Sequence, residues 1–266
     1  MPSLRRIYGE CIFDKYSYYA NFLPVEPVQV GDFGIIDDGA FTRLGSLKDQ
    51  FGLVPELGEL SGEVSSFEFQ FGCEKTAAPN VAATANIPGM AISGAAKFAF
   101  SRTYGILFAA AGCRTQGLRN LAALEPSLKK CFIEKTWNPE WVAVTGTVRS
   151  DAIALLVGAE AGAEIELRAK APIPVNFAAA AAAGGIEIAG ENKLGLKIIG
   201  TNATPFLRIA TVRRKLLRGV VVTYHKFANE SPDYLADLRD NLIREGKPVD
   251  HEFDFREIEK KDGFFG

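Results

Sequence analysis

The sequence lacks the residue patterns on which most enzymes and metalloproteins depend. Only two histidines, His225 and His251, occur among its 266 residues, and they fit no metal-ligand spacing. No Gly-x-Ser-x-Gly, His-Glu-x-x-His, phosphate-binding loop or dinucleotide-binding glycine pattern stands out. These absences argue against a metal, a cofactor and a nucleophilic triad. We therefore expect a protein that is not an enzyme and that needs no cofactor.

Long apolar runs and paired cysteines are missing as well. No stretch reaches 18 consecutive apolar residues, so no transmembrane helix is predicted. The first residues, MPSLRRIYGECIF, have no apolar signal-peptide core. The cysteines form no Cys-x-x-Cys pair and have apolar neighbours, which favours reduced thiols at all four: Cys11, Cys73, Cys113 and Cys131. We expect a chain that is made soluble, in the cytoplasm.

The net charge of the chain is small, but its charged residues are unevenly distributed along the sequence. The formal net charge is −2, yet the stretch from Lys226 to the end holds 7 basic and 11 acidic residues, which leaves the rest of the chain at +2. An acidic segment of this kind suits an internal cover over a basic surface, and equally a solvated terminus. With so small a positive charge and few interleaved aromatics, nucleic-acid binding is not expected. A basic group is the candidate contact with anionic lipid, or else a solvated strand face: Arg213, Arg214, Lys215 and Arg218.

What the sequence has in abundance is alternation of apolar and other residues, which is typical of half-buried strands. Phe67, Phe69 and Phe71 share one face, and Ala96, Phe98 and Phe100 repeat the pattern. The clearest strand is 163–169, and Leu194, Leu196 and Ile198 line another. The stretch 104–111 is apolar on every face, which leaves a buried strand and a short helix open. The predicted fold class is α+β, with a large twisted, mostly antiparallel sheet, a few helices and a helical C-terminal tail.

Turn and cap residues divide these strands. Asp38-Gly39 between apolar runs predicts a hairpin, and Ser46 and Gly52 bracket one helical turn. A helix over 119–135 is predicted to break at Pro126. After Ser231 and Pro232 the sequence predicts a helix with an apolar stripe of Leu235, Leu238 and Leu242. We therefore predict a β-rich body over 1–226 and an acidic, partly helical appendage over 227–266, as a possible inhibitory tail.

The stretch 141–171 predicts two long strands joined by a turn at 158–162. A strand that crosses a bilayer needs about 9–11 tilted residues with one apolar and one polar face. In lipid, such hairpins satisfy their backbone only in a closed assembly of many copies. Alanine-rich faces are weakly apolar, so they suit a soluble form that later refolds. The residues of this candidate insertion hairpin are Val148, Ala152, Ala154, Ala163, Ile165, Leu167 and Ala169.

The order of these parts resembles the gasdermin family of pore-forming proteins, in particular its short bacterial members. FLPVEPVQVGDFGIIDDGAFTRLGSL is similar to the opening hairpin of that family, WVAVTGTVRSDAIALLVGAEAGAEIELRA to an insertion hairpin, and the acidic tail to a short inhibitory C-terminus. The resemblance implies an inactive cytoplasmic monomer that a protease cleaves near the junction of body and tail. The released body then forms homo-oligomers and perforates the lipids of the inner membrane, in cell death or antiphage defence. Bacterial gasdermins tend to carry a lipidated cysteine almost at the N-terminus, and Cys11 is the nearest counterpart here.

A second interpretation stays open. The alternating strands are then the half-buried faces of a soluble, non-enzymatic β domain that binds a ligand or another protein. An enzyme ranks third. Removal of the tail distinguishes the first two interpretations, because a pore former becomes membrane-active and a binding domain only loses stability.

Overall fold

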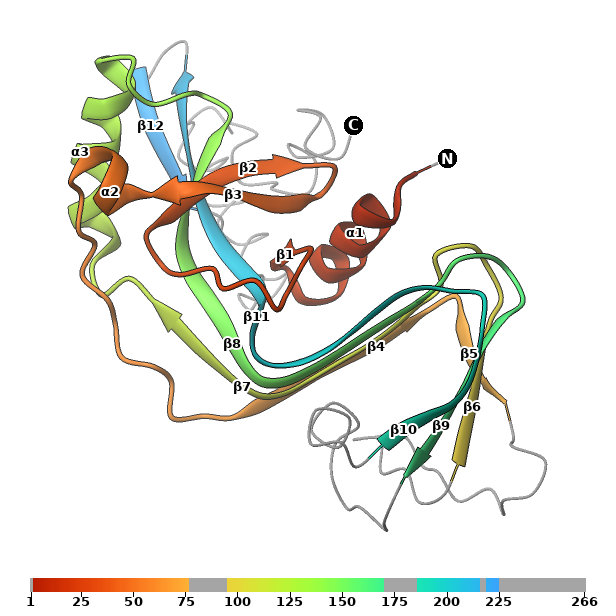
Figure 1. Ribbon diagram of the computed structural model, residues 1–266. Coiled ribbons are helices and arrows are strands. Elements are labelled where there is room, and N and C mark those ends of the chain that lie inside the picture. Colours follow the sequence, from red (N-terminus) through yellow and green to blue (C-terminus); the bar gives the residue numbers. More distant parts are fainter. Residues whose placement is uncertain (1, 77–94, 170–185, 216–218, 225–266) are drawn as a thin grey trace, which may run out of the picture.

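The computed structural model describes residues 2–76, 95–169, 186–215 and 219–224, and shows a sharply bent sheet with a smaller sheet at one end (Figure 1). The large sheet has eight strands in the order β12-β11-β1-β3-β2-β8-β7-β4, and β11 also pairs with β8. Its strands are β1 (Tyr19–Asn21), β2 (Asp32–Asp37), β3 (Ala40–Ser46), β4 (Ser65–Phe71), β7 (Ile106–Gly117), β8 (Trp141–Gly158), β11 (Leu194–Lys215) and β12 (Gly219–Tyr224). Within it only β1 and β3 pair in parallel.

The small sheet has four antiparallel strands in the order β10-β9-β6-β5. They are β5 (Cys73–Thr76), β6 (Ala95–Phe100), β9 (Ala163–Ala169) and β10 (Ile186–Asn192). Three helices complete the described part: α1 (Leu4–Tyr16), α2 (Leu47–Phe51) and α3 (Leu121–Ile133). The α+β fold class with a mostly antiparallel sheet is thus confirmed, while the predicted tail helix lies outside the described residues.

Each strand of the small sheet continues a long strand of the large sheet around a corner. β4 leads into β5 at Gly72, β8 leads into β9 through 159–162, and β10 turns into β11 at Lys193. Residues 101–105 join β6 to β7 in the same way. The chain therefore forms two long, bent hairpins, one from β4 to β7 and one from β8 to β11.

The four corners are tied to one another by backbone hydrogen bonds. The amide of Ser101 donates to the carbonyl of Gly72 at 3.0 Å, and that of Gly158 to Gly105 at 2.9 Å. The amide of Ala159 donates to the carbonyl of Lys193 at 2.9 Å. A side chain has no room at Gly105, where an added Cβ would lie 2.5 Å from the Gly72 oxygen. The bends are thus formed together, by close contact of backbones.

Beyond the corners, the small sheet folds back against one face of the long strands (Figure 1). Ala109, Ala111 and Ala154 on that face allow close approach of the two layers, as does Ala163 of β9. We call the shared apolar layer the intersheet core: Cys73, Phe98, Phe100, Leu107, Ala109, Ala111, Ala154, Leu156, Ala163, Ile165 and Leu167. The alanine-rich faces that the sequence shows are therefore packing surfaces between two sheets.

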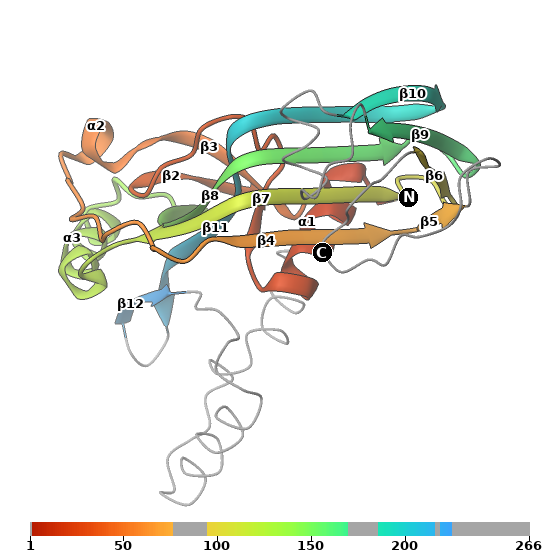
Figure 2. The same cartoon turned by 90° about the horizontal axis from the view of Figure 1, so that it is seen from below.

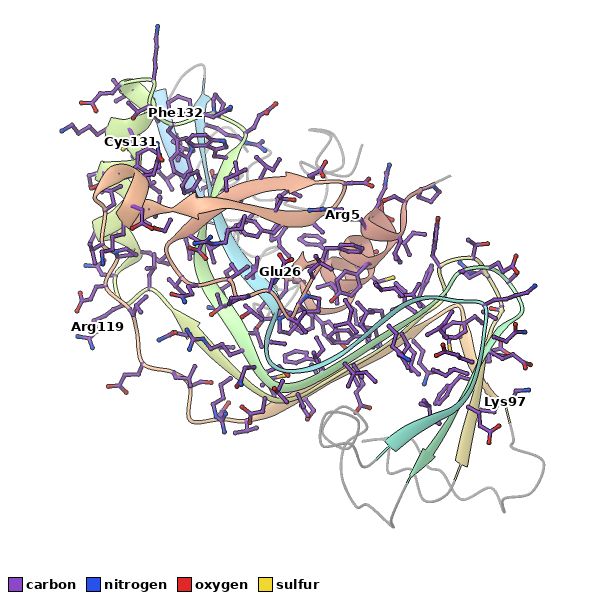
Figure 3. The ribbon with its side chains drawn as sticks, in the orientation of Figure 1. Arg5, Glu26, Lys97, Arg119, Cys131 and Phe132 are labelled. Atoms are coloured by element: carbon purple, nitrogen blue, oxygen red, sulfur yellow. The ribbon has the colours of Figure 1, made fainter. Side chains whose placement is uncertain are left out.

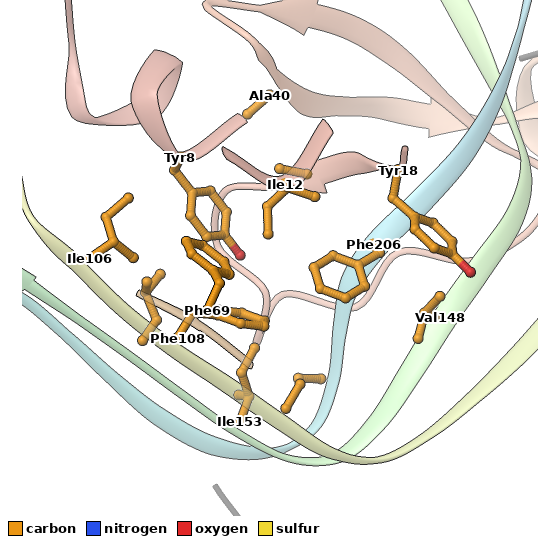
Figure 4. Packing of buried hydrophobic residues seen from close by; sticks show 14 of the residues in the cluster. Tyr8, Ile12, Tyr18, Ala40, Phe69, Ile106, Phe108, Val148, Ile153 and Phe206 are labelled. Carbon is orange, nitrogen blue, oxygen red and sulfur yellow. The ribbon is translucent and has the colours of Figure 1, made fainter. Parts of the chain in front are cut away.

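The opposite face of the long strands lies under α1. Tyr8 and Ile12 of α1 are fully buried there against Phe69, Phe108 and Ile153 (Figure 4). The Tyr8 and Phe108 rings are 6.2 Å apart, and Phe69 stacks on Phe108 at 5.1 Å. Because one face of β8 belongs to this helix-side core and the other to the intersheet core, every residue from Ala152 to Gly158 is buried.

The predictions above do not include α1, although the local signals for this helix are present. Ser3 accepts a hydrogen bond from the Arg6 amide as the N-cap, and Arg6 pairs with Glu10 one turn later. Arg5 fastens the helix to the β2–β3 turn by donating to the carbonyls of Asp37 at 2.8 Å and Ala40 at 3.2 Å (Figure 3). Leu4, Ile7, Tyr8, Cys11 and Ile12 also recur at helical spacing and face the helix-side core, so the apolar stripe that predicts this helix is present in the sequence.

The hydroxyl of Tyr8 is buried without a hydrogen-bond partner among the described residues. Burial also raises the pKa of this phenol, so the group stays neutral. Because a buried unsatisfied hydroxyl costs about 1–3 kcal/mol, we expect Tyr8→Phe to raise the free energy of unfolding by about 1 kcal/mol. Urea unfolding of both proteins measures this, and a loss of stability in the variant would reveal a partner for the hydroxyl.

Several local predictions are confirmed. Asp38 and Gly39 turn β2 into β3 with positive φ angles of 48° and 81°, and Ser46 and Gly52 cap α2. The stretch 104–111 belongs largely to β7, as a strand buried on both faces. The predicted break at Pro126 is wrong, since α3 runs through it. Pro126 lies in the second turn of a helix whose Leu124 and Leu128 are buried, and this packing outweighs the missing backbone hydrogen bond.

The prediction that strands 141–158 and 163–169 pair with each other as a hairpin is also wrong. Both strands exist, but β8 lies in the large sheet between β7 and β2 or β11, whereas β9 pairs with β6 and β10. The turn at 158–162 is a corner between layers, because the Gly162 amide donates to the Phe100 carbonyl of the neighbouring hairpin. Strand alternation alone does not distinguish a hairpin turn from a corner.

Candidate functional site

The candidate site is the small sheet together with the four corners that connect it to the long strands. Its inner face is apolar and closed, with Phe98, Phe100, Ile165 and Leu167 no more than 1% exposed. Its outer face is charged: Lys97 of β6 and Glu164 of β9 form an ion pair of 2.7 Å, and Lys97 lies on the side away from the long strands (Figure 3). The sheet is therefore a ribbon with one apolar and one charged face.

The predicted insertion residues are divided between the two layers. Ala163, Ile165 and Leu167 of β9 lie in the intersheet core together with Ala154 of β8, face to face across the layers. Val148 belongs to the helix-side core instead, and Ala152 is buried in β8. Ala169 is the last residue of β9. The structure thus brings four of the seven residues into one apolar layer.

Length is the second property of the site. The segments 73–100 and 163–192 contain 28 and 30 residues, and each of two tilted strands needs about 9–11 residues to cross a bilayer. The sequence predicts alternating strands at both ends, at 163–169 and in the stretch 81–112 as a second pair, and β9 and β6 confirm the alternation at 163–169 and 95–100. It does not predict that β6 and β9 pair with each other.

An ion pair also joins two of the corners. Lys193, at the turn between β10 and β11, lies 2.5 Å from Glu160 in the corner between β8 and β9. Both side chains are about half exposed, so the pair contributes little to stability. The bent form is therefore held by the apolar layer and the backbone contacts, not by charge.

Cys11, the candidate lipidation residue, lies on α1 and is half-buried against the helix-side core. Burial, and to a smaller extent the nearby carboxylates of Asp14 and Glu10, raise the pKa of its thiol to about 11. The thiol is therefore protonated at neutral pH, and its lipidation stays a prediction. All four cysteines are free thiols, as predicted.

This pKa gives a direct test by alkylation. At pH 8 a thiol with a pKa of about 11 is ionised in about one molecule in a thousand, against about a quarter of the molecules for an unperturbed thiol. We expect iodoacetamide to modify Cys11 at least about 100-fold more slowly in the folded chain than in denaturant, by peptide mass spectrometry. Equal rates in the two conditions would contradict the helix packing described above.

The candidate lipid-contact residues lie far from the small sheet. Arg213, Arg214 and Lys215 end β11 where it pairs with β12, and Arg218 lies outside the described residues. Figure 1 places this end of β11 and the small sheet at opposite ends of the molecule. The structure therefore does not bring the basic group and the predicted insertion residues together.

In the part of the chain that the structure describes, no three histidine, cysteine, aspartate or glutamate side chains gather closely enough to hold a metal ion. Among the same residues, no helix combines the length and the apolar character needed to cross a bilayer.

Comparison with known proteins gives similar solved structures, among them two gasdermins. No protein-family model matches the chain, and no curated protein sequence matches it. The structure of a bacterial gasdermin from Bradyrhizobium tropiciagri is 16% identical, with 83% of this chain and 91% of that chain covered and a TM-score of 0.33. The cryo-EM structure of the Gasdermin A3 membrane pore is 11% identical, with 84% and 95% covered and a TM-score of 0.34. Both are gasdermins, the family that the order of parts in the sequence resembles.

Proposed function

We propose that this protein is a non-enzymatic pore former whose two bent hairpins straighten and enter a membrane. The observation that carries the proposal is the two-faced small sheet, whose inner face packs on the long strands and whose strands continue into them at the four corners. When the corners open, the apolar face of β6 and β9 leaves the intersheet core and meets lipid, while the face with Lys97 and Glu164 meets water.

The energetics of this exchange favour a metastable soluble form. The apolar side chains of the inner face are buried both before and after the change, so their transfer from the intersheet core to lipid is nearly neutral. The strand edges must find partners in lipid, and copies of the same hairpin supply them. Homo-oligomerisation is therefore part of the proposal.

Control by the C-terminal segment is the second part. The segment 227–266 lies outside the described residues, and its charge of opposite sign to the body supports a cover that prevents opening. We propose that a protease cuts between about Lys226 and Pro232. In the cell this gives a cytoplasmic inactive chain, an inner-membrane pore after cleavage, and a role in cell death or antiphage defence.

A dye-release experiment tests the function. A full chain with a site for a specific protease inserted between Phe227 and Ser231 is mixed with dye-loaded vesicles of phosphatidylcholine and phosphatidylglycerol. We expect release only after the protease is added. A matched chain with a scrambled site controls for protease effects on the vesicles.

Circular dichroism must show that the cut chain stays folded. A folded, cut chain that releases no dye contradicts the proposal, and leaves the soluble β domain that binds a ligand or another protein as the better interpretation.

A further inference from the structure

Each of the four corners contains one residue whose backbone is left-handed. Figure 2 shows the long strands side by side in the order β4-β7-β8-β11, with each corner at the end where a strand of the small sheet begins. We call the left-handed residues of this row the hinge residues: Gly72, Tyr104, Gly162 and Lys193, with φ angles of 54°, 58°, 84° and 57°. A straight strand requires a negative φ at every residue, so no corner can straighten while its hinge residue stays left-handed.

Two of the hinge residues are not glycine. In the left-handed conformation the Cβ of an L-residue crowds the following carbonyl oxygen, and only glycine adopts it freely. Asparagine and aspartate tolerate it through short polar side chains, which Tyr104 and Lys193 do not have. The bent form therefore stores backbone strain at one corner of each hairpin, at Tyr104 between β6 and β7 and at Lys193 between β10 and β11.

The hinge residues are also linked to the neighbouring corners through their own amides or carbonyls. Each of them makes one backbone hydrogen bond to a residue in the corner beside it, or at the strand end that borders this corner. The four bonds, with the donor named first, are Ser101 to Gly72 and Tyr104 to Gly158 at 3.0 Å, Ala159 to Lys193 at 2.9 Å, and Gly162 to Phe100 at 2.8 Å. Because a change of φ reorients the neighbouring peptide group, straightening at one hinge residue breaks a bond to the next corner.

We propose that the hinge residues form a single cooperative switch, which opens both hairpins together and is preloaded by the strain at Tyr104 and Lys193. When one hairpin straightens, its strained residue relaxes to an extended backbone, and the hydrogen bonds that held the other hairpin are lost. Glycine at the second corner of each hairpin limits the strain, so the bent form stays folded. The inference rests on the proposed function only for the claim that opening leads to insertion into lipid.

Gly162→Ala tests the cooperativity without a steric clash. An added Cβ at Gly162 meets no atom within 4 Å, so the substitution acts only through the left-handed backbone of the second hairpin. The readout is Cys73, which lies in the first hairpin and is buried in the intersheet core. In the uncut full chain we expect iodoacetamide to modify Cys73 about five- to thirtyfold faster in the variant, by peptide mass spectrometry. Faster amide exchange at 159–163 with an unchanged rate at Cys73 would overturn the cooperative switch, as would no change at either place.

Gly52→Ala is the matched control. Gly52 ends α2 with a φ of 67°, and an added Cβ there also meets no atom within 4 Å. The substitution thus introduces the same backbone penalty at α2, which lies at the other end of the molecule from the small sheet (Figure 1). It should lower the overall stability as Gly162→Ala does and leave the modification of Cys73 unchanged. Equal acceleration by both variants would overturn the inference, because a general loss of stability would then explain it.

A pair of substitutions at Lys193 tests the strain. Lys193→Gly and Lys193→Ala both remove the ion pair with Glu160, but only glycine relieves the left-handed backbone. We therefore expect Cys73 to be modified at least about fivefold more slowly in Lys193→Gly than in Lys193→Ala. Equal rates in these two variants would refute the stored strain.

Dye release from the cut chains separates this inference from the proposed function. Where opening leads to insertion, release follows the same order as the modification of Cys73: faster in Gly162→Ala than in Gly52→Ala, and slower in Lys193→Gly than in Lys193→Ala. Modification in this order without a matching order of dye release would support the switch and contradict the pore. Modification in any other order would overturn the switch, whatever the dye shows.

Discussion

Gly9→Ala is expected to lower the free energy of unfolding by about 1–3 kcal/mol, the usual cost of overpacking. In an isolated helix the same change would be favourable by about 1 kcal/mol. The sign reverses here because an added Cβ at Gly9 would overlap the carbonyl oxygen of Gly39 in the β2–β3 turn. That turn is backbone, and Arg5 holds it, so it has little freedom to move.

The consequence extends to the helix-side core. If α1 is pushed away from the turn, Tyr8 and Ile12 leave their places, and the face of β7 and β8 below them becomes exposed. We expect stronger binding of an apolar dye and faster amide exchange at 106–110. Gly62→Ala is the matched control, since an added Cβ there meets no atom within 4 Å. Equal stability of the two variants would show that α1 does not depend on this close contact.

The second large effect is expected at the corners. In Gly105→Ala, the new methyl group would lie 2.5 Å from the Gly72 oxygen and 2.8 Å from the ring of Phe100. Straight hairpins have no such contact, so the substitution disfavours the bent form alone. We expect the folded chain to lose about 1–3 kcal/mol. Destabilising the bent form also lowers the barrier to opening of the corners. After cleavage, dye release should become about tenfold faster for each 1.4 kcal/mol by which this barrier falls.

Gly190→Ala provides the control within the same small sheet, because an added Cβ there is 3.9 Å from its nearest neighbour, Glu166. It should change neither stability nor release rate appreciably. A Gly105→Ala chain that is less stable but releases dye more slowly would indicate that the corners stay bent during release.

The sequence predicted the elements whose signals are local. Asp38-Gly39, Ser46 and Gly52 determine their turns and caps by their own backbone preferences, and alternating Phe67, Phe69 and Phe71 mark a strand with one buried face. The buried strand 106–111 remained ambiguous with a helix because both of its faces are apolar. Such a pattern gives no period to read.

The arrangement of those elements was less accessible. Alternation shows which face of 163–169 is buried, but not whether it packs beside β8 or on top of it. The difference depends on the contact between Gly105 and Gly72 and on the Gly162–Phe100 hydrogen bond, which join residues distant in the sequence. The position of α1 likewise depends on the close contact between Gly9 of the helix and Gly39 of the β2–β3 turn. No local sequence pattern reveals such a contact.

The most direct test of the central claim measures which face of β9 meets lipid. Single cysteines at Glu164 or Ile165, in a cleavable chain whose native cysteines are replaced by alanine, carry an environment-sensitive fluorophore. After cleavage on vesicles, the account predicts that the probe at 165 shifts to shorter wavelength and is quenched by lipid-attached nitroxides, while the probe at 164 stays accessible to aqueous iodide. The claim that this two-faced strand exchanges its protein contacts for lipid would be contradicted if dye escapes while both probes respond in the same way, or while neither probe responds.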